Sequence, residues 1–295
     1  MIINFRIMDV FNKKITISLR GDLYDLSEPK VMGILNYTPD SFYDGGKYHD
    51  PGAVTDRIAK MTSDGADFID IGAVSSRPGA VMVSEEDEIK RLSRVLNVAR
   101  KRFPDLLISV DTCRSKVANM VVKEFGADMI NDISSGNLDE KMLETIAELQ
   151  VPYIAMHMQG TPPTMQKDPC YDDVVDDIIR YFAQRTRLMR YLGIKDIIID
   201  PGFGFGKTLE HNYTLAARLE ELEMLDFPLL VGFSRKSMIC KALRVGPDKA
   251  LAGTVALNTV ALMKGANILR VHDVKEASDT IKVVKHVKDL SAKMS

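Results

Sequence analysis

The sequence predicts a single (β/α)8 TIM barrel preceded by a short N-terminal β-hairpin. From residue 31 onward, short β-branched apolar runs alternate with longer segments of helical periodicity, which is typical of βα units around a parallel sheet. The alternation repeats eight times, and a polar residue closes nearly every run. With 295 residues, 45% of them hydrophobic, the chain can bury a large core. No Pro/Gly/Ser-rich linker interrupts residues 31–295, so we expect one barrel domain rather than two domains.

Residues 1–30 form a separate N-terminal extension in this prediction. Ile15, Ile17 and Leu19 alternate with polar residues, as in a strand with one buried face. Gly21-Asp22 is the expected hairpin turn. We expect this hairpin to plug the bottom of the barrel.

Eight apolar runs are the predicted barrel strands, and their starts are separated by roughly 20 to 45 residues, the size of βα units with some long loops. In chain order they are Val31–Asn36, Asp67–Gly72, Leu106–Asp111, Asp128–Asp132, Pro152–His157, Asp196–Asp200, Pro228–Gly232 and Asn267–His272. The alternative architecture is an open doubly wound sheet. Since no Gly-x-Gly-x-x-Gly follows the first run, the barrel is favoured.

Helix signals occupy the segments between these runs. Asp50-Pro51 should begin the first helix and Gly65 should end it. Ser84, followed three residues later by Asp87, resembles a capping box at the start of the second. The apolar stripes expected to face the barrel are Val54, Ile58 and Met61 in the first helix, Ile89, Leu92, Leu96, Ala99 and Phe103 in the second, and Ala277, Ile281, Val284 and Val287 in the last.

Charge and cysteine content limit the class of protein. The 39 basic and 41 acidic side chains give a net charge of −2, so we expect neither nucleic acid nor a membrane as a partner. Cys113, Cys170 and Cys240 are too scattered for a disulfide framework or a zinc site, which favours a reducing compartment. Because no signal peptide or membrane-spanning run is evident, we expect a cytoplasmic protein.

Polar residues close the predicted strands, where a barrel interior should be aliphatic. They are Asn36, Asp70, Asp111, Asn131 with Asp132, His157 with Gln159, Asp200, Ser234 with Lys236, and Arg270 with His272. Any one of them has an alternative role as a helix N-cap, most plainly Asp111 before the helix near Arg114. Together they predict a polar small-molecule site at the carboxyl ends of the strands.

Within this set, one group suits a planar heterocycle. Asp200 closes an Ile-Ile-Ile run and would accept hydrogen bonds from ligand N–H donors, and Asn131 can both donate and accept. Lys236 would donate to ring or carbonyl acceptors, while we expect Arg235 to point outward into a salt bridge. Phe203 and Phe205 are candidates for stacking on a flat ring or for simple packing.

A second group suits an anion. Arg270 and His272 alternate along the last strand and so face the same side, which fits a phosphate. The Ser75-Ser76-Arg77 loop adds hydroxyls and a cation, with a surface salt bridge as the alternative for Arg77. Asn36 is a candidate ligand for Mg²⁺, which we expect to arrive with the substrate because no carboxylate cluster demands a metal. The long loop after the first strand has the composition of a mobile lid.

Taken together, these segments resemble the dihydropteroate synthase family, the folate-pathway target of sulfonamide drugs. The resemblance runs from Val31 to Val274 and rests, in order, on MGILNYTPDSFYDGG, DIGAVSSRPGA, ISVDT, NDIS, AMHMQGTPPTMQ, DPGFGFGKTLEHN, GFSRKS and RVHDV. It implies a transferase that condenses p-aminobenzoate with (7,8-dihydropterin-6-yl)methyl diphosphate, releasing pyrophosphate. It also implies a homodimer.

The resemblance also implies residue roles. The pterin contacts would be Asp111, Asn131, Asp200 and Lys236, of which Asp111, Asp200 and Lys236 with Arg270 are the candidate catalytic residues. The diphosphate and anion site would be Arg270, His272, Ser76 and Asn36 with Mg²⁺, and the p-aminobenzoate surroundings Thr38, Pro39, Arg77, Pro78, Phe205, Lys236 and Ser237. The family commonly has Gly-Glu-Ser-Thr-Arg-Pro where this chain has Ala73-Val74-Ser75-Ser76-Arg77-Pro78. We expect these departures to affect binding geometry rather than chemistry.

Two alternatives share the pocket. A pterin-dependent methyltransferase domain has a similar barrel and acidic pterin pocket but would not need the cations of Ser234-Arg235-Lys236 and Arg270-x-His272. A non-catalytic pterin-binding protein would keep the pocket without the chemistry.

Overall fold

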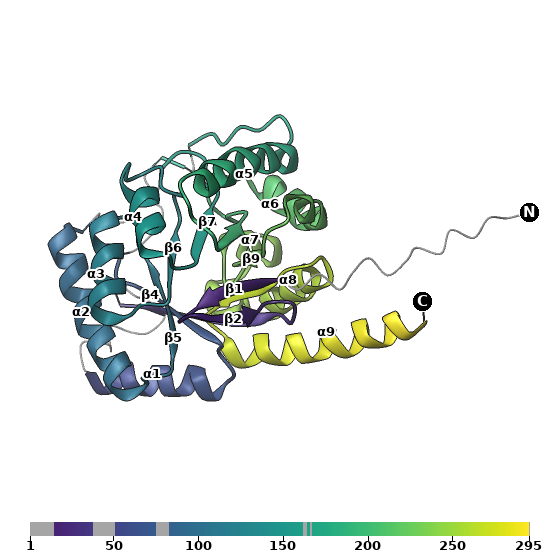
Figure 1. Ribbon diagram of the computed structural model, residues 1–295. Coiled ribbons are helices and arrows are strands. Elements are labelled where there is room, and N and C mark those ends of the chain that lie inside the picture. Colours follow the sequence, from purple (N-terminus) through teal and green to yellow (C-terminus); the bar gives the residue numbers. More distant parts are fainter. Residues whose placement is uncertain (1–14, 38–50, 75–82, 162–163, 166, 295) are drawn as a thin grey trace, which may run out of the picture.

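Eight parallel strands form a nearly closed barrel in the computed structural model, which describes residues 15–37, 51–74, 83–161, 164–165 and 167–294 (Figure 1). The barrel strands are β3 (Lys30–Asn36), β4 (Phe68–Gly72), β5 (Leu107–Asp111), β6 (Met129–Asp132), β7 (Tyr153–Met156), β8 (Ile197–Asp200), β9 (Leu230–Val231) and β10 (Ile268–Val271). Each overlaps one of the predicted runs, so the predicted barrel is confirmed.

The strands pair in the order β8-β7-β6-β5-β4-β3-β10-β9. Between β8 and β9, the closing edge of the barrel, the pairing is a single parallel bridge of Ile199 with Leu229. The backbone N–H of Ile199 donates to the carbonyl of Pro228 at 3.0 Å. This seam is therefore the most weakly paired joint of the barrel.

Helices pack around the barrel and bury its outward-facing apolar residues (Figure 1). They are α1 (Pro51–Ser63), α2 (Glu85–Arg102), α3 (Ser115–Phe125), α4 (Met142–Leu149), α5 (Val174–Tyr191), α6 (Leu209–Ala217), α7 (Ser237–Leu243), α8 (Leu251–Met263) and α9 (Val274–Met294), with 3-10 turns η2 (Leu219–Leu225) and η3 (Pro247–Lys249). The Ser84 half of the predicted capping box of α2 is present, since the Ser84 hydroxyl accepts from the Asp87 N–H at 3.1 Å. The Asp87 carboxylate accepts from the Ser84 hydroxyl at 2.8 Å.

The N-terminal hairpin consists of β1 (Thr16–Leu19) and β2 (Asp22–Asp25). Its turn is Arg20-Gly21, with φ of 53° and 91°, so the predicted Gly21-Asp22 turn is wrong by one residue. A two-residue turn with both φ values positive matches the twist of the strands. Arg20 adopts this conformation, unusual for a side chain with a Cβ, while its guanidinium binds Asp128 in the barrel.

The hairpin closes the amino-terminal end of the barrel, as predicted. Ile17, Leu19 and Leu26 pack on buried side chains near the amino-terminal ends of the barrel strands. These strand residues are Met32, Phe68, Met129, Ile154, Ile198, Leu230 and Ile268, with half-buried Leu107. We call the end of the barrel that contains this apolar layer the floor, and the carboxyl ends of the strands the mouth.

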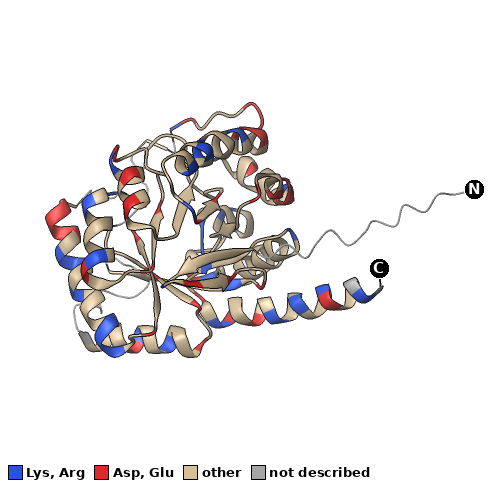
Figure 2. Ribbon diagram, viewed as in Figure 1, with Lys and Arg blue, Asp and Glu red and all other residues tan. Residues whose placement is uncertain are grey.

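Helix α9 extends beyond the barrel (Figure 1). Ala277 and Val284 are buried as predicted, but Val287 is 48% exposed because it lies in the extending part. Positively and negatively charged residues are interspersed along α9 (Figure 2), whereas α2 has its acidic residues in the first turn and basic residues in the last. No helix in the described ranges is both long and apolar enough to cross a lipid bilayer.

Candidate active site

Side chains two residues beyond the floor also point into the barrel, because successive strand residues face opposite sides. These positions are Ile34, Asp70, Ser109, Asn131, Met156, Asp200, Gly232 and Arg270. The interior layer at the floor is wholly apolar, whereas the next layer, two residues nearer the mouth, is rich in polar groups. The strand period alone brings Asp70, Asn131, Asp200 and Arg270 to a common interior.

Arg270 is the centre of one network. Its Nε donates to Asp70 Oδ2 at 2.7 Å, and its Nη2 donates to Asp111 Oδ2 at 3.0 Å. Asp70 Oδ2 also accepts from the Asn131 amide at 3.0 Å. Side chains from four strands are therefore connected through Arg270 and the fully buried carboxylate of Asp70.

Asn36 reaches this network at the rim. Asn36 pairs with Gly72, and Gly72 pairs with Asp111, across three neighbouring strands. A Cβ at Gly72 would lie 3.6 Å from Asn36 Oδ1 and 3.7 Å from Asp111 Oδ2. The glycine thus lets an amide oxygen and a carboxylate oxygen face the same point.

Burial dominates the electrostatics of Asp111 and Arg270. It raises the pKa of Asp111 to about 7, against the opposing effect of Arg270 and with help from Asp70. Burial also opposes the charge of Arg270, yet Asp70 and Asp111 raise the pKa of this guanidinium overall. Arg270 remains a cation at neutral pH, while Asp111 is poised between its two forms.

Asp200 and Lys236 line the opposite side of the mouth. Asp200 Oδ1 accepts from the Gly202 N–H at 2.8 Å, and burial raises the pKa of Asp200 despite the nearby Lys236. Lys236 donates to the Phe203 carbonyl at 2.5 Å, with its Nζ 4.9 Å from the centre of the Phe205 ring. Burial lowers the pKa of Lys236 to about 8.

His272 lies near the cations Arg270, Arg235 and Arg57. Its Nδ1 is 3.0 Å from the Ser234 hydroxyl, and its carbonyl accepts from Arg57 of α1 at 3.1 Å. Burial and then Arg270 lower the pKa of His272 to about 3. In the free protein His272 is therefore a neutral hydrogen-bonding group rather than a second positive charge.

Several predicted strand-end residues do not join the mouth. Asp132 points outward and binds the Tyr153 hydroxyl at 2.7 Å, because the strand period places it opposite to Asn131. Its other carboxylate contacts are with Ser134 and Gly136, so it shapes the loop after β6. His157 is buried against Lys207, and Gln159 binds the backbone of Cys170.

Three further expectations are resolved by the contacts. The Asp111 carboxylate binds Arg270 and does not cap α3. The first backbone N–H of α3, that of Ser115, donates to the Asp139 carboxylate instead. Arg235 forms the predicted salt bridge, with Asp273 at 2.5 Å. The Phe203 ring is fully buried on Phe233, so Phe203 meets Lys236 through its backbone carbonyl, whereas Phe205 presents its ring to the Lys236 ammonium.

The remaining predicted site residues fall into two groups. Ser237 is exposed at the start of α7 and follows Lys236 directly. Thr38, Pro39, Ser76 and Arg77 lie outside the described residues, as do Ser75, Pro78 and the predicted lid after β3.

Sequence reasoning gave no role to two residues that the structure places in these networks. Asp70 was identified only as a strand end, although its even spacing from Phe68 already directs it inward. Lys207 follows the glycine-rich Gly202–Gly206 segment and is buried beside His157. An ionisable residue directly after such a segment is the signal that could have identified it.

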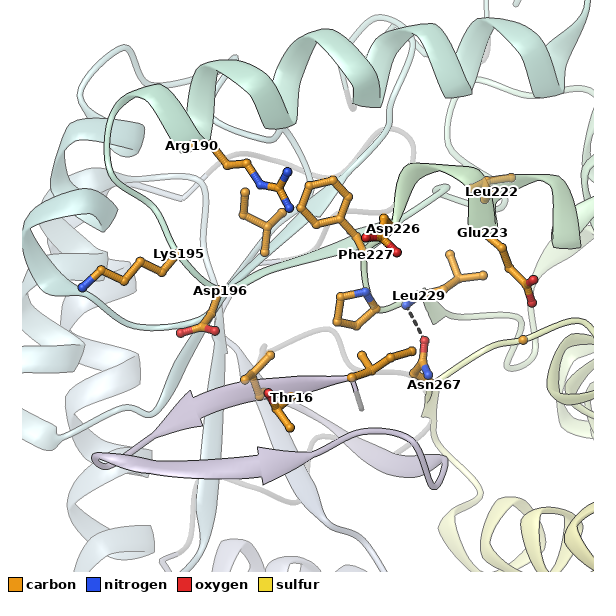
Figure 3. A pocket seen from close by; sticks show the side chains of 15 residues that line it. Thr16, Arg190, Lys195, Asp196, Leu222, Glu223, Asp226, Phe227, Leu229 and Asn267 are labelled. Atoms are coloured by element: carbon orange, nitrogen blue, oxygen red, sulfur yellow. Dashed lines mark hydrogen bonds between the residues drawn. The ribbon is translucent and has the colours of Figure 1, made fainter. Parts of the chain in front are cut away.

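A pocket of about 480 Å³ lies at the other end of the barrel, between β1 and the starts of β8 and β9 (Figure 3). Arg190 stacks on Phe227 at 4.5 Å from the ring centre, and Asn267 accepts from the Leu229 N–H at 2.8 Å. These polar groups connect loops of the floor. The converging carboxylates and cations lie at the mouth, where barrels carry their active sites.

No group of three or more His, Cys, Asp or Glu side chains in the described part of the chain is arranged to hold a metal ion. The oxygen atoms of Asn36 and Asp111 at the rim are an amide and a carboxylate donor, which are the kinds of ligand that Mg²⁺ takes.

Comparison with known proteins agrees with this geometry. The model of a family described as pterin binding enzyme matches residues 32–272. Dihydropteroate synthase of Escherichia coli K12 is 47% identical over 276 residues, covering 93% of this chain and 96% of that protein. The Yersinia pestis dihydropteroate synthase structure with a sulfonamide drug has a TM-score of 0.89 and 44% identity over 93% of this chain and all 100% of that one. The Xanthomonas albilineans enzyme with 4-aminobenzoic acid has a TM-score of 0.84 and 38% identity, covering 94% and 99% of the two chains.

Proposed function

The chain belongs to the dihydropteroate synthases of the pterin-binding enzyme family, and from this premise we propose how its mouth carries out the reaction. The enzyme is a transferase that joins p-aminobenzoate to (7,8-dihydropterin-6-yl)methyl diphosphate. The bond from the methylene carbon to the diphosphate oxygen breaks, and a bond from the same carbon to the amine nitrogen forms. The amine loses one proton, and pyrophosphate leaves.

We propose that the interior polar layer binds the pterin ring. Asp111 and Asp200 would accept hydrogen bonds from the ring's N–H groups, Asn131 would pair with its donor and acceptor edge, and Lys236 would donate to a ring or carbonyl acceptor. The single observation that carries this proposal is that these groups, from β5, β6, β8 and the residue before α7, lie together at the carboxyl ends of the strands. Buried polar groups of this kind are matched only by an equally polar ligand.

Positive and negative charge separate in the transition state, and we propose that residues at the mouth stabilise each of them. Carbon–oxygen cleavage leaves positive character on the pterin methylene, which the carboxylates of Asp111 and Asp200 would stabilise. Negative charge collects on the departing pyrophosphate, which Arg270 would neutralise and His272 would hydrogen-bond. No protein nucleophile is required.

We propose that p-aminobenzoate enters beside Phe205, Lys236 and Ser237, with Thr38, Pro39, Arg77 and Pro78 as further contacts and Ser76 on the diphosphate side. The exposed position of Ser237 next to Lys236 supports an entry from solvent at this edge. Because related enzymes have been solved with a sulfonamide and with 4-aminobenzoic acid, we expect a sulfonamide to compete with p-aminobenzoate here.

We further propose that Asn36 holds a magnesium ion delivered with the diphosphate. The amide oxygen of Asn36 and the nearby oxygen of Asp111 are hard donors that fit this ion, which usually keeps waters and phosphates as its other ligands. When bound, the ion supplies positive charge to the leaving diphosphate. Asn36→Ala should raise the magnesium concentration that gives half-maximal rate.

The test of the proposed function is pyrophosphate release by the purified protein in the presence of pterin diphosphate, magnesium and p-aminobenzoate. Release that requires p-aminobenzoate supports the synthase. Binding of the pterin without release would support a non-catalytic binding protein. Methyl transfer from a methylated pterin without use of p-aminobenzoate would support the methyltransferase alternative.

We propose that the enzyme is a homodimer that buries α8 and α9 against a second copy. Val260 and Met263 on α8 and Val283, Val287 and Leu290 on α9 are all more than a third exposed, and α8 packs beside α9. Light scattering on a sizing column should give twice the chain mass of 32.9 kDa. Val287→Glu with Leu290→Glu should yield a monomer, whereas an unchanged dimer would contradict this interface.

We propose that the enzyme acts in the cytoplasm on small-molecule substrates alone, without nucleic acid or membrane. The three cysteines are free thiols, which supports a reducing compartment. The near-neutral net charge of −2 provides no field for an anionic polymer or surface.

A further inference from the structure

Lys207 is a buried cation held by neutral groups. Only 3% of the residue is exposed. Its Nζ lies 3.0 Å from His157 Nδ1 and donates to the carbonyl oxygens of Gly202 at 3.0 Å and Phe205 at 3.1 Å. Among its hydrogen bonds to the described residues, none goes to a carboxylate. Burying a lysine in this way is costly, so the groups that it holds indicate why it is there.

These three contacts satisfy the amine in both of its forms. As an ammonium, Lys207 donates to two carbonyls and to His157 Nδ1. As a neutral amine, it donates to the two carbonyls and accepts from an Nδ1–H tautomer of His157. Burial lowers the pKa of Lys207 to about 7, with a smaller opposing effect from Asp200. The two carbonyl contacts therefore persist on both sides of neutral pH.

The carbonyls belong to the Gly202–Gly206 loop that follows β8. Gly202 and Gly206 have φ of 69° and 59°, in the left-handed region. A Cβ at Gly202 would lie 1.9 Å from the His157 carbonyl oxygen, and one at Gly206 would lie 2.5 Å from that of Gln159. The loop therefore packs against the segment that follows β7, and Lys207 connects two of its carbonyls to His157, the first residue after that strand.

The same loop fixes Lys236. The Phe203 carbonyl accepts from Lys236 Nζ, and the Phe205 ring lies under this ammonium group. Lys207 binds the carbonyl of Phe205 itself and that of Gly202, the residue before Phe203. A change in loop shape would therefore move both groups that hold Lys236.

We propose that Lys207 is a positioning residue for the transferase reaction, which holds the Gly202–Gly206 loop in the shape that places Lys236 over its substrates. This inference rests on the proposed role of Lys236 in substrate binding. It assigns to Lys207 an action through Lys236 and no contact with substrate.

A double-mutant cycle tests the coupling. Lys207→Met, Lys236→Met and the double variant are compared with the unchanged enzyme by kcat/KM for each substrate, with rates normalised to correctly folded protein. We expect Lys207→Met to lower kcat/KM by about tenfold or more, since small misplacements of a binding group are costly. In the Lys236→Met background the same change should cost less than about twofold, because residues that act as a unit are not additive.

Each outcome decides the matter. Equal losses from Lys207→Met in both backgrounds, or no loss in either, overturn the positioning role. If Lys236→Met itself keeps full activity, the proposed function of Lys236 fails, which is a result distinct from failure of the coupling. The cycle is repeated with Lys207→Gln, whose polar side chain supports folding should Lys207→Met not fold. Asp128→Asn, at the floor, is the control for lowered stability with unchanged kcat/KM.

Discussion

The floor and the mouth of the barrel handle buried charge in opposite ways. At the floor, Asp128 accepts from Arg20 at 2.6 Å, Arg100 at 2.7 Å and the Ile108 N–H at 2.8 Å, so both its oxygens are paired. At the mouth, Asp70 Oδ1 is buried without a hydrogen-bond partner among the described residues. Burial raises the pKa values of Asp111 and Asp200 there. Paired charges stabilise the fold, and the under-paired ones await a ligand.

The largest expected effect is that of Arg270→Ala. The change removes the cation proposed for the diphosphate and leaves Asp70 and Asp111 without it, so we expect a loss of about 3–5 kcal/mol in transition-state binding, more than about 100-fold in kcat/KM. Steady-state pyrophosphate release measures it. Arg235→Ala, which breaks the salt bridge with Asp273, should cost less than about tenfold. Unchanged kinetics for Arg270→Ala would remove Arg270 from the mechanism.

Asp200→Asn should separate activity from stability. The amide cannot stabilise positive charge on the pterin, so kcat/KM should fall by about 100-fold. The folded state no longer buries a carboxylate whose pKa is raised by burial, so the melting temperature at pH 8 should stay the same or rise. A lower melting temperature together with normal activity would reverse the assignment of Asp200 from function to stability.

Asp128→Ala should do the opposite at the floor. Arg100 and the Ile108 N–H would lose their acceptor, and Arg20, whose side chain is 40% exposed, would lose less. We expect about 2–4 kcal/mol less free energy of unfolding, measured with urea. The kcat/KM should change by less than about twofold. Lys60→Ala, in an exposed pair with Asp64, is the matched control and should cost at most about 0.5 kcal/mol.

The smallest effect is on pH dependence. Burial raises the pKa of Asp111 to about 7, so in the free protein this carboxyl takes up a proton as the pH falls through 7. Ligand N–H groups need the ionised form, so pterin affinity should decline below this pH by at most about tenfold per pH unit. Calorimetry in two buffers of different ionisation enthalpy should detect proton release on binding at pH 6. Asp111→Asn should abolish that release.

The free energy of unfolding of the ligand-free protein should also depend on pH through the Asp111 carboxyl. Because the folded pKa of Asp111 lies above its ordinary value, this group favours the folded state at low pH, and the contribution is lost as the pH rises through 7. Urea unfolding of Asp111→Asn at pH 5 and pH 8 should show a smaller difference than in the unchanged protein. An equal difference would place the titration elsewhere.

Most of the fold could be predicted from the sequence because parallel barrel strands are buried on both faces. Such strands appear as continuous apolar runs, and each predicted run overlaps its strand. The hairpin was located by its alternation of Ile15, Ile17 and Leu19. Its turn was displaced by one residue because nothing in the sequence marks Arg20 as the residue with positive φ. That conformation depends on contacts with Asp128, distant in the chain.

The site was predictable to the extent that strand period and residue type determine it. The same rule that directs Asn131 inward directs Asp132 outward, so the two could have been separated from the sequence alone. Which cation pairs with which carboxylate depends on the stagger between strands, which no single run contains. For this reason the pairing of Asp70 with Arg270 required the structure. The contacts of Lys207 depend in the same way on how the loop after β8 folds back.

The single bridge between β8 and β9 has a consequence for what a substrate does to the enzyme. Asp200 ends the strand on one side of this seam, and Lys236 follows the strand on the other. A pterin that binds both side chains would connect β8 and β9 through its own hydrogen bonds, where the backbone pairing is a single bridge. The substrate would thus complete the barrel wall, and each product release would loosen it again.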